Sequence, residues 1–512
     1  MEYSAADRYL TAHRERHLGE LQAFLRIPSV SALPAHRPDI ARASEWLADR
    51  LRSAGVPDVR IMPTAGSPVV FGSWTARAGL PTILLYGHYD VQPVDPVALW
   101  QTPPFEPAVR DGRLVARGAS DDKGSLFIPL AALEAVRDAA GGPPVNVKFL
   151  FEGEEEIGSP NLAPFLHQHR KLLAADVTVS ADGGQWNVET PSLTLGNRGL
   201  TGLQVNLRGA GTDLHSGTYG GAVANPLHAL AALLAGMHDA QGRVTVRGFY
   251  DAVRTLSAAE RRELARVPFN EAAMRKELGV TALVGEPKYA PLERTWIRPT
   301  LEVNGMWGGF QGDGSKTVLP NEAHAKITCR LVPDQDPDRI AEALEQHIRR
   351  HTPAGVTVAI TRSKGKARPY LMPADHPGLA AAAKALRAAY GREPVRVRLG
   401  GTLPVADLVK RELGTWLVFF AFGEPDNLVH APNEFLRLQT FDRGTRAYVR
   451  FFDELSRAEP AALRSDGAGP SGARGPAGRR ARSSPRRPRR PARGGGSRRS
   501  APTRAQRRSR TR

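Results

Sequence analysis

The residues with the clearest chemical potential lie in the stretch 149–160, FLFEGEEEIGSP. An apolar, strand-like run over residues 145–151 ends there in four carboxylates within five residues. Ser159 and Pro160 then have the types expected at the cap and first turn of a helix. Acids packed at the end of a buried strand repel one another and resist ionisation unless a positive charge lies among them. A divalent cation would supply that charge, whereas a solvated acidic turn would need none.

Four other metal-capable side chains follow predicted strands or precede predicted helices. They are His88 after the strand 81–86, Asp121 before a helix that begins near Gly124, Asp182 after the strand 176–180, and His430 after the strand 416–422. Taken singly, each has an ordinary alternative as a turn residue, a helix cap or a surface imidazole. In doubly wound sheets, however, ligands bind at the carboxyl ends of the strands, so these side chains and Glu156 could meet at one edge. Two imidazoles and three carboxylates without a thiolate suit zinc, manganese or cobalt in a hydrolytic site.

The elements that must position these residues alternate between buried strands and helices up to about Asn197. This alternation predicts an α/β domain with a mostly parallel sheet covered by helices. The pattern then changes to strands near 202–207, 300–304, 324–332 and 356–361, with helices near 225–237 and 336–351. That order is the split βαβ arrangement of a ferredoxin-like α+β domain. A charged, helical insertion is expected at about 256–278, and the first pattern returns from Pro377.

These patterns predict one catalytic α/β domain that is interrupted by a second domain. Its first part is residues 1–198, the inserted lid or dimerisation domain is 199–370, and its second part is 371–457. Residues 458–512 are rich in Arg, Pro, Ser and Gly and have almost no large apolar side chain. Such a composition cannot bury enough surface to fold alone, so this tail is expected to be disordered.

The net charge of +18 is concentrated in the same tail. From residue 461 to the end there are 17 arginines and one acid, Asp466, which gives +16 and leaves +2 for the rest of the chain. The tail could bind nucleic acid or another polyanion. It could equally be a dispensable extension or the product of a shifted reading frame. The folded body is near neutral, so the total charge does not indicate a nucleic-acid enzyme.

Cysteine usage and hydropathy exclude several other classes. The single cysteine, Cys329, rules out an intrachain disulfide and a cysteine-rich zinc site. The first 25 residues are charged and helical in pattern, without the apolar core of a signal peptide. No window of 18 apolar residues is present, so no membrane span is expected. A cytoplasmic protein without a membrane partner is therefore expected.

Seven motifs resemble the family of dinuclear zinc peptidases that includes carnosinase, glutamate carboxypeptidase, succinyl-diaminopimelate desuccinylase and aminoacylase. The motifs are HYDVQP at 88–93, RGASDDKG at 117–124, EGEEEIGS at 152–159, SADG at 180–183, DLHSG at 213–217, GGTLP at 400–404 and NLVHAPNE at 427–434. They fall in order across about residues 9–455, so only the tail is left uncovered. The inserted segments 294–312 and 316–320 are most similar to the carnosinase-like dipeptidase branch.

The resemblance implies two divalent metal ions, with zinc the first choice and manganese or cobalt as alternatives. Asp121 would bridge both ions. His88 and Asp182 would complete the site of one ion, and Glu156 and His430 that of the other.

The resemblance also implies roles for two residues beside these ligands. Glu155 would be the general base that takes a proton from a water held by the metals and passes it to the leaving amine. Asp90 would hold His88 through the second ring nitrogen, provided that the strand bends after His88. Spacing alone does not choose between Glu154 and Glu155 as the base, and the resemblance favours Glu155.

Further roles follow from the family pattern outside the metal ligands. His215 would cross a dimer interface and stabilise the oxyanion in the partner subunit, which implies a homodimer formed through the inserted domain; an ordinary loop histidine is the alternative. Arg330, with Gly401 and Thr402, would hold the terminal carboxylate of the substrate, because a guanidinium grips a carboxylate with two hydrogen bonds. Arg330 could instead be a solubilising charge on an edge strand. Leu399 stands where relatives frequently have Glu, so exopeptidase specificity stays open.

The sequence as a whole therefore predicts a metal-dependent dipeptidase or exopeptidase that cleaves a small peptide at the amide next to a free carboxylate. An N-acyl-amino-acid deacylase or desuccinylase with the same two metals is the alternative within this chemistry. A polyanion or nucleic-acid binder that acts through the basic tail is the alternative from another class.

Overall fold

The computed structural model describes residues 3–466, and its largest sheet has six strands in the order β1-β2-β6-β3-β7-β17. The strands are β1 (Asp58–Met62), β2 (Val69–Trp74), β3 (Thr82–His88), β6 (Asn146–Glu152), β7 (Val177–Ser180) and β17 (Leu417–Phe419). Because β2 alone pairs antiparallel with its neighbours, the other five strands run in one direction. The mostly parallel sheet predicted from the sequence is confirmed.

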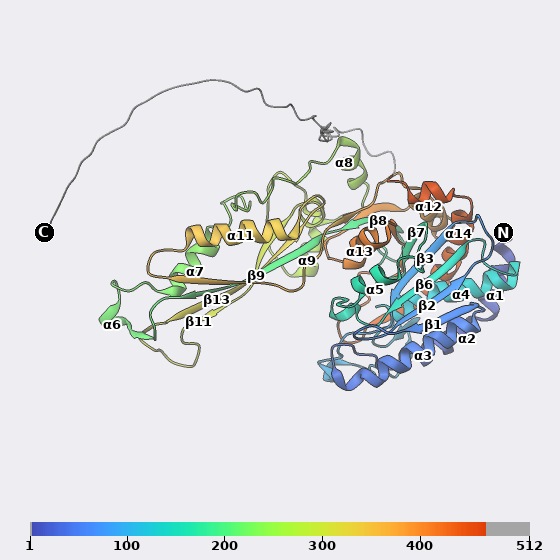
Figure 1. Cartoon of the computed structure of the whole chain (residues 1–512), viewed down its shortest axis with the longest axis horizontal. Coiled ribbons are helices and arrows are strands. Elements are labelled where there is room, and N and C mark those ends of the chain that lie inside the picture. The colour runs from blue at the N-terminus through green and yellow to red at the C-terminus, as the bar shows by residue number, and fades with distance from the viewer. Residues whose placement is uncertain (1–2, 467–512) are drawn as a thin grey trace, which may run out of the picture. The chain divides into compact units, whose positions relative to one another are not determined.

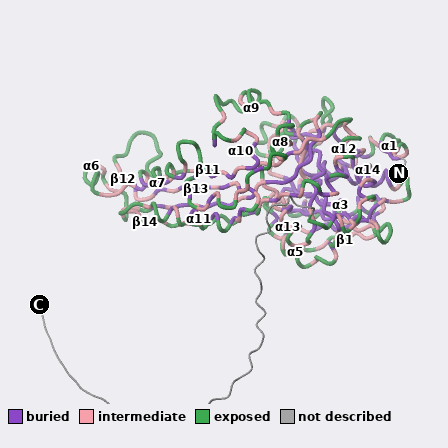
Figure 2. The backbone as a smooth tube through the Cα atoms, turned by 90° about the horizontal axis from the view of Figure 1, so that it is seen from above, coloured by how far each residue is buried: buried purple, intermediate pink, exposed green. Residues whose placement is uncertain are grey.

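Helices pack around this sheet and enclose the main core (Figure 1). They are α1 (Tyr3–Ala12), α2 (Arg14–Leu25), α3 (Arg37–Ser53), α4 (Lys123–Ala140), α5 (Leu162–His169), α12 (Pro377–Tyr390), α13 (Pro404–Leu413) and α14 (Leu438–Ser456). Helix α14 shows how the sequence drives this packing, because Phe441, Tyr448, Phe452 and Leu455 recur at helical spacing and are all buried. Buried residues are dense around this sheet, whereas the inserted domain is mostly intermediate or exposed (Figure 2).

The inserted domain is built on a four-stranded antiparallel sheet in the order β11-β13-β9-β14. Its elements are β9 (Gly199–Arg208), α7 (Pro226–Ala235), β11 (Thr300–Gly308), β13 (Glu322–Leu331), α11 (Pro337–His351) and β14 (Thr357–Arg362). Side chains alternate along β13, so that Ala325, Ile327 and Cys329 enter a second core beneath α7 and α11. The element order and strand order are those of the predicted ferredoxin-like domain.

A small mixed sheet lies where the chain passes between the two domains. It consists of β15 (Tyr370–Leu371), β8 (Ser192–Asn197) and β16 (Val395–Leu399). The expected helical insertion forms α8 (Ala258–Leu264) and α9 (Glu271–Leu278), and α10 (Pro291–Trp296) follows it. Helix α8 packs against β16 beside a third apolar cluster that contains Trp296 and Val397. The domain boundaries at 198/199 and 370/371 fall at this small sheet and stay a prediction.

The remaining elements are short. They are η1 (Pro34–His36), η2 (Val97–Leu99), η3 (Glu155–Ile157), β4 (Ala108–Arg110), β5 (Arg113–Val115), β10 (Leu214–His215), α6 (Ser216–Tyr219), β12 (Val318–Leu319), β18 (Phe435–Arg437) and α15 (Pro460–Arg464). Helix α15, with Leu463 buried, lies beyond residue 458, where the sequence predicts that the tail begins. Most of the predicted disordered tail and its proposed polyanion binding fall on residues 467–512, outside the described residues. Within residues 3–466, every helix is too short or too polar to cross a membrane.

Candidate metal centre

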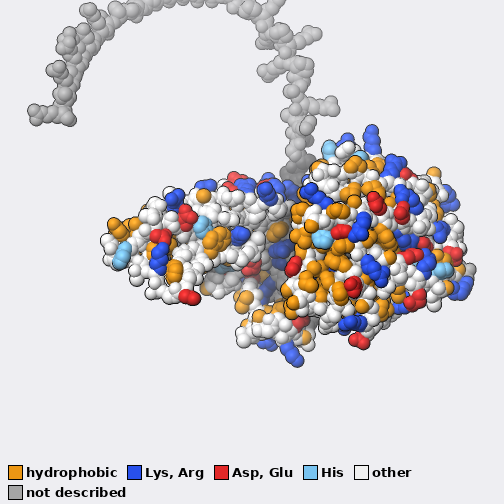
Figure 3. Space-filling model, turned by 90° about the horizontal axis from the view of Figure 1, so that it is seen from below, with side chains coloured by type: hydrophobic (Ala, Val, Ile, Leu, Met, Phe, Trp, Pro, Cys, Tyr) orange, Lys and Arg blue, Asp and Glu red, His pale blue; other side chains and the backbone are white. Residues whose placement is uncertain are grey.

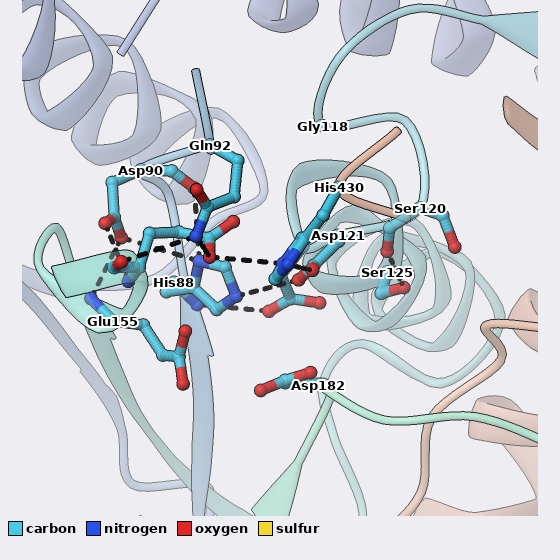
Figure 4. Close-up of polar contacts among 12 residues, drawn as sticks. His88, Asp90, Gln92, Gly118, Ser120, Asp121, Ser125, Glu155, Asp182 and His430 are labelled. Atoms are coloured by element: carbon cyan, nitrogen blue, oxygen red, sulfur yellow. Dashed lines mark hydrogen bonds and ion pairs between the residues drawn. The ribbon is translucent and has the colours of Figure 1, made fainter. Parts of the chain in front are cut away.

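Three neighbouring parallel strands end at the same edge of the large sheet. Strand β3 ends at His88, which pairs in register with Glu152, the last residue of β6. Strand β7 ends at Ser180, paired with Tyr86 of β3, and Asp182 follows two residues later. Because parallel strands bring their carboxyl ends to one edge, residues almost a hundred positions apart become neighbours here. Figure 4 shows His88 and Asp182 near one another at this edge.

Five side chains at this edge form two groups that share Asp121. The first group is His88, Asp121 and Asp182, the second is Asp121, Glu156 and His430, and within each group the ligand-capable atoms lie within 4.8 Å of one another. The two oxygens of Asp121 face different histidines: Oδ1 lies 3.1 Å from Nε2 of His88, and Oδ2 lies 2.9 Å from Nε2 of His430. The structure thus brings together all five residues that the sequence singled out. The carboxylate of Asp121 lies between the two groups and belongs to both.

The loop that carries Asp121 is held by a buried acid to which sequence reasoning gave no role. Glu434, with no exposed side-chain surface, accepts hydrogen bonds from the backbone N–H groups of Gly118, Ser120 and Asp121. It also pairs with the buried guanidinium of Arg117 at 2.7 Å. The one signal of Glu434 in the sequence is its place at the end of the NLVHAPNE motif, because its partners lie more than 300 residues away.

The loop that carries His430 has an uncommon backbone. Leu428, His430 and Asn433 all have positive φ angles, of 56°, 64° and 65°. Such a conformation costs about 1 kcal/mol for a residue with a side chain, so other contacts must hold it. Asn427 is one of these, because its Oδ1 accepts hydrogen bonds from the N–H of Glu424 and the hydroxyl of Ser120. The loop is therefore fastened to the same segment that carries Asp121.

The structure separates the two glutamates that spacing alone could not separate. The carboxylate of Glu154 accepts hydrogen bonds from the N–H of Ser67 and from Nδ2 of Asn161, each at 2.8 Å, which ties it into the surrounding loops. Glu155 has no such side-chain partner among the described residues, and Figure 4 shows its carboxylate near that of Asp182. Of the two, Glu155 is the one available to a reacting molecule.

Asp90 contacts both His88 and the turn that carries Glu155 and Glu156. Its carboxylate accepts hydrogen bonds from the N–H groups of Glu155 and Glu156, at 3.2 and 3.1 Å, and its Oδ1 lies 3.4 Å from Nδ1 of His88. The same ring nitrogen lies 3.1 Å from the backbone oxygen of Asp90. Asp90 therefore contacts the histidine and orients the turn that presents Glu155 and Glu156.

The electrostatics of the site reflect an excess of buried acids. Burial raises the pKa of Glu155 to about 9 and that of Asp182 to about 7, and neighbouring carboxylates add to both shifts. Burial opposes protonation of His88, but Asp121 and Asp90 outweigh it and raise its pKa. Hydrogen bonds to Asp121 and Glu156 raise the pKa of His430 to about 10. Positive charge placed among these groups would stabilise the ionised acids.

The donor set fits divalent cations. Glu156 is held through Oε2, which accepts a hydrogen bond of 2.7 Å from Gln92, while its Oε1 is buried and has no hydrogen-bond partner among the described residues. A buried carboxylate oxygen without a partner is costly unless a cation or water occupies its free side. Imidazole nitrogens and carboxylate oxygens in two groups of three are ligands that zinc, manganese and cobalt accept.

The other residues predicted to act on substrate lie outside this cluster. His215 is exposed at the end of β10, next to α6, which lies at the end of the inserted domain away from β3 and β7 (Figure 1). Arg330 of β13 donates a hydrogen bond of 2.7 Å to the hydroxyl of Thr402. Gly401 is exposed in the loop before α13, and Leu399 ends β16. The guanidinium of the inserted domain thus meets the GGT loop of the catalytic domain.

Comparisons with known proteins agree with this geometry. The model of Peptidase family M20/M25/M40 matches residues 84–454, well over half of the chain. Beta-Ala-His dipeptidase of Homo sapiens is 29% identical over 469 residues, which are 88% of this chain and 92% of the relative. The structure of the di-peptidase Dug1p from Saccharomyces cerevisiae has a TM-score of 0.76 at 25% identity and covers 89% of this chain and 99% of its own. That of the metallo-carboxypeptidase Sso-CP2 from Sulfolobus solfataricus has a TM-score of 0.75 at 32% identity and covers 86% and 99%.

Proposed function

The chain belongs to Peptidase family M20/M25/M40, and we propose that it is a dinuclear metallo-dipeptidase that cleaves the amide next to a free carboxylate. The observation that carries the proposal is the position of Asp121, whose two oxygens face two separate histidines and so can bridge two cations. A dipeptidase and a metallo-carboxypeptidase are among the named relatives, and both names describe hydrolysis near a peptide's end.

We assign one ion to His88, Asp121 and Asp182 and the other to Asp121, Glu156 and His430. Two such cations act as Lewis acids that make the scissile carbonyl more electrophilic and a nearby water more acidic. Zinc is the metal we propose, because two imidazoles and three carboxylates suit it; manganese and cobalt share this ligand preference.

In this proposal the residues around the ions move the proton and hold the geometry. Glu155 takes a proton from the attacking water and delivers it to the departing amine, so that one carboxylate serves as base and then as acid. Asp90 keeps Glu155 and His88 in position through the contacts described above. A base whose position is fixed before the substrate arrives loses little entropy in the reaction.

The substrate's terminal carboxylate is assigned to Arg330, Gly401 and Thr402. The contact between Arg330 and Thr402 places a guanidinium and a hydroxyl together, and both can donate to a carboxylate. Since the inserted and catalytic domains each supply one of these groups, binding of a free carboxylate would link them. This arrangement favours substrates with a free C-terminus over internal peptide bonds.

We also propose that the enzyme acts as a homodimer in which His215 serves the partner's site. His215 is exposed and stands apart from the metal-capable residues of its own chain. Apolar side chains are exposed on the same domain, namely Tyr219, Met306, Trp307 and Phe310. Figure 3 shows exposed apolar side chains among charged ones on one face of the molecule. Exposed apolar residues of this size are common at protein interfaces.

Light scattering and activity assays of the native chain and of His215→Ala separate assembly from catalysis. The variant should stay dimeric and lose activity.

The deciding experiment compares substrates. The metal-loaded enzyme is assayed with unblocked dipeptides, with the same dipeptides amidated at the C-terminus, and with N-acyl amino acids. Faster hydrolysis of the unblocked dipeptides supports the proposal. Equal activity on amidated dipeptides would show that the terminal carboxylate is not recognised. Activity on N-acyl amino acids alone would identify a deacylase.

The role of Glu155 is tested with a neighbouring control. Glu155→Gln should lower kcat by roughly 10²–10⁴-fold, the usual contribution of a positioned acid–base group, at unchanged metal content. Glu154→Gln changes the adjacent acid in the same way and should leave kcat within about threefold, because Glu154 is tied to Ser67 and Asn161. The opposite pattern would make Glu154 the base.

A further inference from the structure

A second arginine lies beside the proposed carboxylate site and has no role so far. Arg198 is the residue between β8 and β9, where the chain enters the inserted domain. Its Nε donates a hydrogen bond of 2.7 Å to the backbone oxygen of Gly400, and its Nη1 donates one of 3.4 Å to that of Arg298. These contacts fix its guanidinium against the loop that also contains Gly401 and Thr402, while its Nη2 makes no hydrogen bond within the described residues.

Arg198 and Arg330 lie beside the same loop, and both are partly buried without an acid that pairs with them among residues 3–466. Within residues 3–466, neither forms an ion pair with a carboxylate, whereas Arg117 pairs with Glu434 and Arg298 pairs with Glu286. Glu302 on β11 influences Arg198 electrostatically but is exposed and makes no ion pair with it. Charged groups withdrawn from water are ordinarily paired. Two guanidiniums without an ion pair beside one loop can therefore accept anions from outside the chain.

Both arginines stay positively charged at neutral pH. Burial and the neighbouring charge of Arg330 lower the pKa of Arg198 to about 10, which is still well above 7. Burial also lowers the pKa of Arg330. Like charges held this close raise the energy of the empty site, and a bound anion relieves that repulsion. A bound substrate with one carboxylate neutralises only one of the two guanidiniums, Arg198 or Arg330.

We propose that Arg198 is a specificity-determining residue that binds a second carboxylate, on the side chain of the substrate's C-terminal residue. The inference rests on the proposed dipeptidase function and assigns its substrate class as dipeptides that end in aspartate or glutamate. Arg330 and Thr402 hold the main-chain carboxylate, and the free Nη2 of Arg198 donates to the side-chain carboxylate. The loop leaves room for it, since a Cβ added to Gly401 would meet no other atom within 4 Å.

The first test needs no mutation. The metal-loaded enzyme is assayed with Ala-Glu and Ala-Gln, which have nearly the same shape and differ in the charge of the last side chain. A charge-assisted hydrogen bond to a partly buried guanidinium predicts a kcat/KM for Ala-Glu that is roughly tenfold or more above that for Ala-Gln. Equal values for the two peptides would overturn the inference.

Variants then assign the preference to one residue. Arg198→Gln should reduce the ratio of the two kcat/KM values to about two or less, mainly through a higher KM for Ala-Glu, with Ala-Gln affected little. Arg198→Lys keeps the charge and should retain part of the ratio. Arg208→Gln removes one positive charge from the exposed end of β9 and should leave the ratio unchanged. If Arg198→Gln kept the native ratio, or lowered both substrates equally, Arg198 would not be the determinant.

A binding measurement covers the case in which turnover is slow. The metal-loaded Glu155→Gln enzyme is titrated with each dipeptide in a calorimeter, and Ala-Glu should bind roughly tenfold more tightly. The ratio is measured on one folded protein, so a general loss of stability does not alter it. Hydrolysis of neither dipeptide, with N-acyl amino acids cleaved instead, would reject the proposed dipeptidase function; hydrolysis of both at the same rate would reject only the role of Arg198.

Discussion

Two buried charged clusters in the catalytic domain are built on opposite principles. In the helix cluster, Glu134 of α4 accepts hydrogen bonds from Arg16 and His17 of α2 and from Arg50 of α3 at 2.7–3.0 Å. In the metal cluster, His88, Asp121, Glu155, Glu156, Asp182 and His430 place four acids against two imidazoles. Both clusters are removed from water to a similar degree, but only the helix cluster contains enough positive charge of its own.

The difference appears in the acidity of the carboxyl groups. Burial would raise the pKa of Glu134, but His17, Arg50 and Arg16 outweigh it and hold that pKa well below its ordinary value. At the sheet edge, burial dominates and raises the pKa of Glu155 and Asp182. An acid with internal partners stabilises the fold, whereas acids without them need cations from solution. Charge balance thus distinguishes the helix cluster from the proposed metal site.

Removal of metal should have the largest effect and should act on the sheet edge alone. Dialysis against a chelator is expected to reduce hydrolysis to background, because the Lewis acids that the reaction needs are lost. Addition of zinc, manganese or cobalt should restore it. The measurement is activity against bound metal determined by elemental analysis, and two equivalents should be required. Full activity in the metal-free protein would show that the acids at the sheet edge do not need cations from solution, which would contradict the comparison of the two clusters.

Neutralising the acid of the helix cluster should have the next largest effect, on stability. Glu134→Gln leaves the guanidinium of Arg50, of which 4% is exposed, without its buried carboxylate. Breaking a buried pair in this way costs about 3–5 kcal/mol of unfolding free energy. Urea unfolding of the metal-free protein measures this loss. By the same measurement Glu155→Gln should be neutral or stabilising, because the side chain of Glu155 has no hydrogen-bond or ion-pair partner within residues 3–466. Equal losses in both variants would contradict the comparison.

The pH dependence of stability should differ in sign between the clusters. The folded-state pKa values of Asp182 and Glu155, about 7 and about 9, lie above their ordinary values of 3.8 and 4.5. The metal-free fold therefore binds more protons than the unfolded chain, and these groups stabilise it less as the pH rises from about 4 toward those values. Glu134, with a lowered pKa, stabilises the fold above about pH 4.5 and loses this effect as the pH falls.

The observable is the gain in Tm on adding metal, measured at several pH values. Cations bind the ionised carboxylates, so the gain should increase between about pH 5 and pH 8. Glu134→Gln should not change the slope of this increase, although its absolute Tm is lower. A metal effect that is constant over this range would show that the buried acids are already ionised.

The smallest expected effect concerns Glu154, which lies beside the metal cluster but resembles the helix cluster in having partners. Glu154→Gln weakens its hydrogen bonds to Ser67 and Asn161 and should cost about 1–2 kcal/mol of unfolding free energy. Metal content should stay at the native value. A loss of bound metal in this variant would place Glu154 in the metal cluster.

The sequence alone predicted a large part of this protein. Apolar runs such as 145–151 and 81–86 identified the parallel strands, because strands buried on both faces need continuous apolar residues. The change of pattern after Asn197 predicted the inserted α+β domain. The sequence also predicted that five metal-capable side chains meet at one edge of the parallel sheet, namely His88, Asp121, Glu156, Asp182 and His430. Strands β1 and β2 and the small sheet of β8, β15 and β16 were not predicted, since their short runs carry little periodic signal.

The tertiary structure alone decided which contacts neighbouring residues make. Glu154 and Glu155 are adjacent and chemically equal, and spacing alone does not separate them. Their contacts differ, because Glu154 is held by Ser67 and Asn161 whereas Glu155 lies beside the metal cluster. Glu434 acquires its role from backbone groups over 300 residues away, and Arg198 becomes notable because no acid within residues 3–466 forms an ion pair with it. Local sequence determines strands and helices through short-range periodicity. Burial and charge balance depend on which distant segments the fold brings together, and these set the chemistry of each side chain.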